Sequence, residues 1–154
     1  MSTEVRDRTD AATKAPTLTK PRVLVVEDDA DQRSLFAWML RSEGWAVEEA
    51  GTGVELLQWI GVATSTTQRT FDVVLADVNM PDLSTIEVLS GWKYGGWTVP
   101  FVVVTAQADE KVRAEAQALG AVAVLQKPVE KDALRDALEQ ALIRGRARGD
   151  APSS

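Results

Sequence analysis

Side chains that can take part in metal or phosphoryl chemistry directly follow four apolar stretches of the sequence. They are, in chain order, Glu27, Asp28, Asp29, Asp77, Thr105 and Lys127. Short continuous apolar runs of this kind are typical of strands buried on both faces of a sheet. In an open parallel α/β sheet, ligands bind at the carboxyl ends of the strands, so we expect these side chains to meet at one edge.

Carboxylates from neighbouring strands repel one another unless a cation lies between them. A hard divalent ion such as Mg²⁺ suits oxygen ligands and commonly completes its shell with waters and a substrate phosphate. Thr105 and Lys127 would hold phosphoryl oxygens, and Asp77 is a carboxylate nucleophile able to form an acyl phosphate. The pattern therefore predicts a site for Mg²⁺-dependent phosphoryl transfer.

The composition excludes several other chemistries. The chain of 154 residues has no histidine and no cysteine, so disulfides, Cys/His zinc sites, thiol nucleophiles and Ser-His-Asp triads are ruled out. Hydrophobic residues make up 45% and charged residues 26%, as in an ordinary globular domain. The chemistry must come from carboxylates, hydroxyls, lysine or backbone groups.

The apolar runs alternate with amphipathic segments. We expect strands at residues 23–26, 71–76 and 101–104, with weaker candidates at 46–49 and 121–125. Helices are predicted between them by apolar residues at helical spacing, for example Leu35, Phe36, Met39 and Leu40 on one face of residues 30–42. Thr52 with Glu55 and Ser84 with Glu87 fit the capping box that opens a helix. Five strands alternating with five helices predict an α/β fold with a parallel sheet covered on both faces.

Charge and periodicity divide the chain into a domain and two tails. We expect a flexible segment at residues 1–21, a domain at 22–144 and a flexible tail at 145–154. Residues 23–143 hold 19 acidic and 9 basic residues, a net charge of −10 that would repel nucleic acid. No apolar stretch approaches the length of a membrane span, and the N-terminus lacks a signal-peptide core. We therefore expect a cytoplasmic protein that binds neither nucleic acid nor membrane.

Four motifs resemble the receiver domain of two-component response regulators. They are V-L-V-V-E-D-D at 23–29, D-V-V-L-A-D-V-N-M-P at 72–81, V-V-V-T-A at 102–106 and G-A-V-A-V-L-Q-K-P at 120–128. The resemblance covers residues 22–143. It implies a three-layer, doubly wound, flavodoxin-like fold with five parallel strands in the order 2-1-3-4-5.

The resemblance also implies a role for each site residue. Asp77 would accept the phosphoryl group, and Mg²⁺ would be held by Asp28, by Asp77, by Glu27 mostly through a water, and by the Asn79 carbonyl. Thr105 would be the switch hydroxyl that moves to bond the phosphoryl group, with Lys127 as the charge partner. The Lys127–Pro128 peptide is commonly cis in this family.

The partners expected from the resemblance are proteins. The phosphoryl group would come from a phosphohistidine of a sensor histidine kinase or a histidine phosphotransfer protein, because this chain has no histidine of its own. The chain would be a signalling domain and not an enzyme, limited to Mg²⁺-dependent self-phosphorylation and slow loss of phosphate. About ten residues follow the last expected helix, so output would be a protein contact unless the chain is a piece of a longer protein.

Some positions depart from the family pattern. Val124 stands where the family usually has an aromatic switch residue, and Thr85 stands where glycine is common. The segment 61–70 is longer than usual. Trp92 and Trp97 are candidates for an exposed partner patch.

Each feature also has an ordinary structural explanation. The acids at 27–29 can cap a helix, Asp77 can belong to a turn, and Thr105 or Lys127 can be a solvated strand end. Two other functions stay open. The first is a receiver fold that binds a partner independently of phosphorylation. The second is a phosphatase with an aspartate nucleophile, against which Asn79 occupies the position where such enzymes carry a second aspartate.

Overall fold

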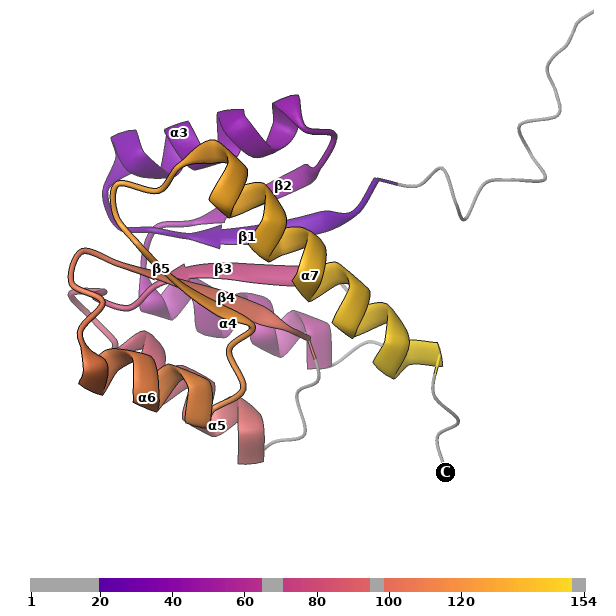
Figure 1. Ribbon diagram of the computed structural model, residues 1–154. Helices are drawn as coiled ribbons and strands as arrows, with labels where there is room; N and C mark the ends of the chain where they lie inside the picture. Colours follow the sequence, from indigo (N-terminus) through magenta and orange to yellow (C-terminus); the bar gives the residue numbers. More distant parts are fainter. Residues whose placement is uncertain (1–19, 65–70, 95–98, 151–154) are drawn as a thin grey trace, which may run out of the picture.

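The computed structural model describes residues 20–64, 71–94 and 99–150 and contains a five-stranded parallel sheet (Figure 1). The strands lie in the order β2-β1-β3-β4-β5, which confirms the predicted fold class. Their bounds are Arg22–Val26 for β1, Ala46–Ala50 for β2, Val73–Asp77 for β3, Phe101–Thr105 for β4 and Ala123–Gln126 for β5.

Helices cover both faces of the sheet, as Figure 1 shows with α3 and α7 above it and α4, α5 and α6 below. Their bounds are Ala30–Ser42 for α3, Gly53–Thr64 for α4, Thr85–Tyr94 for α5, Glu110–Ala118 for α6 and Lys131–Asp150 for α7. None of the helices in the described ranges is both long and apolar enough to span a membrane.

Alternate residues of the central strands fill two separate cores. Val23 and Val25 of β1 pack with α3 and α7, whereas Leu24 and Val26 pack with α4, α5 and α6. The same alternation holds in β3 and β4, so both faces of these strands are buried. A strand in this position needs an apolar side chain at every residue, and this explains the continuous runs in the sequence.

Capping residues set the helix ends close to where the sequence predicts them. Asp29 caps α3 by accepting a hydrogen bond from the Gln32 N–H at 3.0 Å. The Thr52 hydroxyl accepts one from the Glu55 N–H, also at 3.0 Å, at the start of α4. After α3, Gly44 adopts a positive φ of 95°, a conformation that favours glycine.

The structure differs from the sequence predictions in the buried face of α3 and in the end of α7. Leu35 does not share the buried face of α3, because 55% of it is exposed while Phe36, Met39 and Leu40 are buried. The last helix continues beyond residue 144 and ends at Asp150. Residues 65–70 and Trp97 lie outside the described ranges, as does the side chain of Trp92, so the expected patch at Trp92 and Trp97 stays a prediction.

The weak fifth strand begins two residues later than predicted. Ala121 lies beyond α6 but is still bonded to its last turn, since its N–H donates to the Ala116 carbonyl at 3.0 Å. The Lys127–Pro128 peptide that follows β5 is cis, as the family resemblance implies.

Candidate functional site

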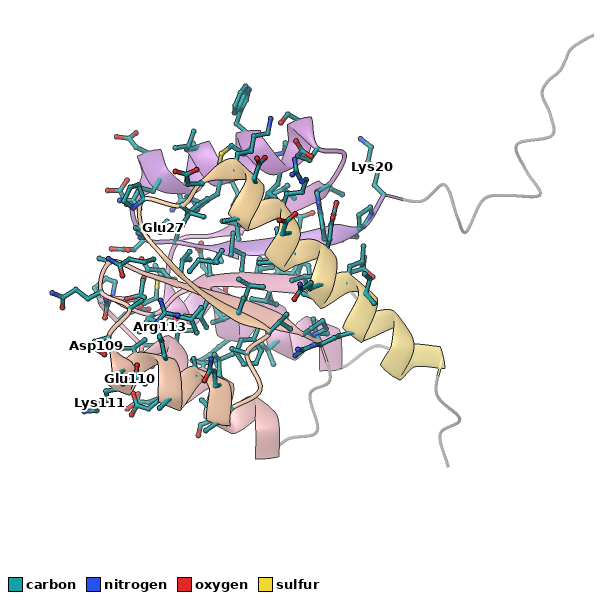
Figure 2. All side chains as sticks on the ribbon, in the orientation of Figure 1. Lys20, Glu27, Asp109, Glu110, Lys111 and Arg113 are labelled. Carbon is teal, nitrogen blue, oxygen red and sulfur yellow. The ribbon has the colours of Figure 1, made fainter. Side chains whose placement is uncertain are left out.

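The carboxyl ends of β1, β3, β4 and β5 bring the predicted site residues to one edge of the sheet. Glu27 follows β1, Asp77 is the last residue of β3, and Thr105 is the last residue of β4. All three side chains are buried, with exposures of 1%, 4% and 1%. Figure 2 shows Glu27 at this edge, beyond the end of β1.

Lys127 joins the two buried acids. Its ammonium donates to Glu27 Oε1 at 2.7 Å and to Asp77 Oδ2 at 2.8 Å. These contacts connect residues 100 and 50 positions apart in the sequence. Charge-assisted bonds of this length hold three side chains from three strands in one arrangement.

Glu27, Asp28 and Asp77 form a cluster that suits a metal ion. Each offers a carboxylate oxygen, and these oxygens lie within 4.8 Å of one another. Asp28 is exposed, whereas the other two are buried, so the cluster opens to solvent on one side. All three ligands are hard oxygens, as Mg²⁺ prefers, and the open side leaves room for the waters that Mg²⁺ usually keeps.

The electrostatics of the cluster favour an added cation. Burial raises the pKa of the Glu27 carboxyl above its ordinary value, although the hydrogen bond from Lys127 acts in the opposite direction. Burial lowers the pKa of Lys127, but its hydrogen bonds to Asp77 and Glu27 outweigh burial and leave that pKa raised. The ammonium is therefore charged at neutral pH. Its single positive charge is outnumbered by the three carboxylates of the cluster.

The three acids after β1 divide between two tasks. Asp29 caps α3, which is the ordinary structural role considered for these acids. Its side chain accepts the hydrogen bond from the Gln32 N–H. Glu27 turns back instead, and its Oε2 accepts a hydrogen bond from the Asp29 N–H at 3.1 Å. The helix cap thus orients the acid that contacts Lys127.

Backbone groups of the loop after β3 hold Asp77. The Asn79 N–H donates to Asp77 Oδ1 at 2.9 Å, so both carboxylate oxygens of Asp77 have a donor. The Thr85 hydroxyl, buried at the start of α5, donates to the Asp77 backbone carbonyl. The predicted role of the Asn79 carbonyl as a metal ligand stays a prediction.

Thr105 reaches the same edge but bonds within its own loop. Its hydroxyl accepts from the Gln107 N–H at 3.1 Å and donates to the Gln107 carbonyl at 3.2 Å. Both hydrogen bonds that the structure gives this hydroxyl are thus to Gln107, and among the described residues no hydrogen bond joins it to Lys127 or Asp77.

Two contacts around the site were missed from the sequence. Asp82 accepts from the N–H groups of Gly53 at 2.8 Å and Val54 at 3.1 Å, and so caps α4 from 29 positions away. Its loop packs so closely on α4 that a Cβ at Gly53 would lie 2.4 Å from the Leu83 Cβ. No local sequence pattern predicts such a cap, because it depends on how two elements pack.

Arg113 on α6 is the second omission. Its guanidinium donates to two backbone carbonyls, at Ala108 and at Val124. An arginine on an amphipathic helix usually indicates a solvated face, so no sequence pattern singles Arg113 out.

Comparison with known sequences identifies the family. The model of the response regulator receiver domain matches residues 23–139. The transcriptional regulatory protein FixJ of Bradyrhizobium diazoefficiens is 33% identical over 119 residues, which are 75% of this chain and 54% of FixJ. The sensor histidine kinase RcsC of Salmonella typhi is 34% identical over 113 residues, which are 73% of this chain and 11% of RcsC. The chain spans about half the length of these curated relatives or less.

Solved structures agree with the sequence comparison. The chemotaxis response regulator CheY4 of Vibrio cholerae superposes with a TM-score of 0.69 at 28% identity, covering 80% of this chain and all of CheY4. A CheY-like receiver domain from Methanospirillum hungatei gives a TM-score of 0.73 at 25% identity, covering 84% of this chain and 99% of that one. With its motifs, strand order and family match in agreement, the chain belongs to the response regulator receiver domains of two-component signalling.

Proposed function

We propose that this receiver accepts a phosphoryl group on Asp77 and signals through protein contacts. It would do so in the cytoplasm, and the donor would be a phosphohistidine of a sensor histidine kinase or histidine phosphotransfer protein, since this chain contains no histidine. The observation that carries the proposal is the position of Asp77. It is a buried carboxylate that bonds the Lys127 ammonium at 2.8 Å and lies in an oxygen cluster with Glu27 and Asp28.

In the transfer, a carboxylate oxygen of Asp77 attacks phosphorus. The new O–P bond forms an acyl phosphate while the N–P bond of the phosphohistidine breaks, and the imidazole leaves with the electron pair and takes up a proton. The protein does no further covalent chemistry. Its contribution is to position Asp77 and to neutralise charge on the transferred group.

The acid cluster would hold Mg²⁺ through Glu27, Asp28, Asp77 and the Asn79 carbonyl. When bound there, the ion neutralises negative charge on the phosphoryl oxygens as they approach the carboxylates. Glu27 is fixed for this task by the Asp29 N–H and by Lys127.

Lys127 and Thr105 would bind the phosphoryl oxygens once the group is in place. Lys127 already contacts the oxygen of Asp77 and can donate to a neighbouring phosphoryl oxygen without leaving the site. Thr105 bonds Gln107 in the present state and would have to exchange those bonds for one to the phosphoryl group.

The test is phosphorylation by a small donor. With acetyl phosphate and Mg²⁺, we expect the intact protein to gain the mass of one phosphoryl group, and Asp77→Asn to gain none. Asp136→Asn, an exposed aspartate on α7, serves as the matched control and should label like wild type. Undiminished labelling of Asp77→Asn would reject the assignment, and labelling independent of Mg²⁺ would reject the metal role.

A further inference from the structure

The loop between β4 and α6 is held by an arginine that reaches it from α6. Arg113 Nε donates to the Ala108 carbonyl at 3.1 Å, and Nη1 donates to the Val124 carbonyl at 3.4 Å. Figure 2 shows Arg113 with Asp109 and Glu110 around the start of α6. One partly buried guanidinium thus ties the loop to strand β5.

The same loop contains the Thr105 hydroxyl and its two bonds to Gln107. At the other end of the loop, Asp109 caps α6 by accepting from the Val112 N–H at 3.0 Å. Between the two lies Ala108, whose carbonyl Arg113 holds. Arg113 therefore holds the backbone at the residue next to Gln107. A movement of the Gln107 backbone has to work against this bond.

Val124 explains why this contact matters in the present chain. Its buried side chain is small and aliphatic, whereas the family usually has an aromatic side chain at this position. Its backbone carbonyl is nevertheless bonded to the arginine that also holds the loop. In this chain a guanidinium joins the loop to the backbone of β5 at the position of Val124.

We propose that Arg113 is a positioning residue that restrains Thr105 in its bonds with Gln107 and so opposes phosphorylation of Asp77. The inference rests on the proposed function, in which the Thr105 hydroxyl leaves Gln107 to bond the phosphoryl group. Arginine suits the task because its planar fork donates to two acceptors at once, which the single ammonium of lysine does less well. A contact that stabilises the arrangement with Thr105 bonded to Gln107 lowers the population of the arrangement that binds a phosphoryl group. The apparent affinity for a phosphoryl group or its analogue falls by the same factor.

The first experiment compares phosphorylation rates. We expect Arg113→Met to raise the rate constant for labelling by acetyl phosphate, and the affinity for beryllofluoride with Mg²⁺, by about fivefold, the scale of one lost hydrogen bond. Arg113→Lys should fall between Met and wild type. Arg41→Met is the matched control, because Arg41 donates to the Val47 carbonyl of β2, at the far edge of the sheet. This variant should leave both quantities unchanged.

A second experiment separates restraint of Thr105 from a general structural effect. In the Thr105→Val background, Arg113→Met should no longer change the rate, because the hydroxyl that it restrains is gone. In the unphosphorylated Arg113→Met protein, the methyl NMR signal of Thr105 should shift toward its position in beryllofluoride-bound wild type.

The outcomes distinguish the two proposals. If wild type is not labelled at Asp77, the proposed function fails. If Asp77 is labelled but Arg113→Met leaves the rate unchanged, slows it, or acts equally with and without the Thr105 hydroxyl, the role of Arg113 is overturned. Should Arg113→Met be unfolded at the assay temperature, the Arg113→Lys comparison with the same Thr105→Val background decides the question.

Discussion

The loops after β3 and β4 both begin at the site, but they are anchored in different ways. In the loop after β3, Asp82 caps α4, the Thr85 hydroxyl bonds the Asp77 carbonyl, and the Asn79 N–H bonds the Asp77 carboxylate. In the loop after β4, the Thr105 hydroxyl bonds Gln107, and Arg113 holds Ala108.

The difference separates a fixed half of the site from a half that can change. The bonds of the first loop use groups that need not move when a phosphoryl group arrives at Asp77. The bonds of the second loop use the Thr105 hydroxyl, which the phosphoryl group would recruit. Phosphorylation would then rearrange one loop against a rigid neighbour, and this is how a small added charge biases a two-state element.

The largest expected effect comes from Lys127, which bonds Asp77 through its ammonium and the Thr105 carbonyl through its backbone N–H. Lys127→Met should lower the free energy of unfolding by about 3 kcal/mol at neutral pH, because Glu27 and Asp77 then remain buried without their shared counter-charge. Adding Mg²⁺ should recover part of the loss. Urea unfolding with and without Mg²⁺ measures both; equal stability of wild type and variant would show that the acid pair does not depend on the lysine.

In the fixed half, Thr85→Val should cost about 2 kcal/mol of unfolding free energy. The valine keeps the shape but removes the hydroxyl that donates to the buried Asp77 carbonyl. Thr85→Ser should restore most of the stability. If serine is no better than valine, the hydroxyl does not anchor this loop.

In the changing half, Thr105→Val should cost less, about 0.5–1 kcal/mol, because the Gln107 groups that it leaves belong to an exposed residue and can bond water. Asp77 should still be labelled. The amide NMR shifts of residues 106–109, however, should respond to beryllofluoride much less than in wild type. A full response in the valine variant would remove the distinction between the two loops.

The smallest effect concerns Asp82 and depends on pH. The hydrogen bond from the Gly53 N–H is the main cause that lowers the pKa of Asp82 below its ordinary value. The stabilisation is therefore present above the ordinary pKa and is lost as pH falls through the lowered one. The Tm of Asp82→Ala should lie below wild type at pH 7, and the two should converge as the pH falls below about 4, the ordinary pKa of an aspartate.

Asp82→Asn serves as the control, since it keeps one acceptor for the α4 cap without the charge. Its Tm should lie between those of wild type and alanine at neutral pH. A Tm difference that stays constant on acidification would mean that the carboxylate contributes through packing alone.

Most of the fold followed from the sequence because a buried parallel strand requires apolar residues on both faces. Residues 23–26 and 101–104 have that pattern, and β1 and β4 lie there with one added residue each. That Glu27, Asp77 and Lys127 lie at one edge of the sheet was predictable for a related reason, since parallel strands place their following residues at a common edge. The bonds from Lys127 to both acids were not part of that prediction.

The rest depends on packing that a local pattern does not contain. Leu35 precedes Phe36 by one residue, or about 100° around the helix, and that rotation places it outside the buried stripe. The cap from Asp82 to Gly53 and the bond from Arg113 to Val124 each join separate elements, so their sequence spacing gives no indication of contact.

The close approach of Gly53 to Leu83 makes the start of α4 sensitive to a single methyl group. An alanine at this position would act as a wedge, because its Cβ has no room beside the Leu83 Cβ. The loop would have to move away from the helix, and the hydrogen bonds from both N–H groups to Asp82 would break. One added carbon atom outside the acid cluster would thereby loosen the loop after β3, whose groups bond Asp77.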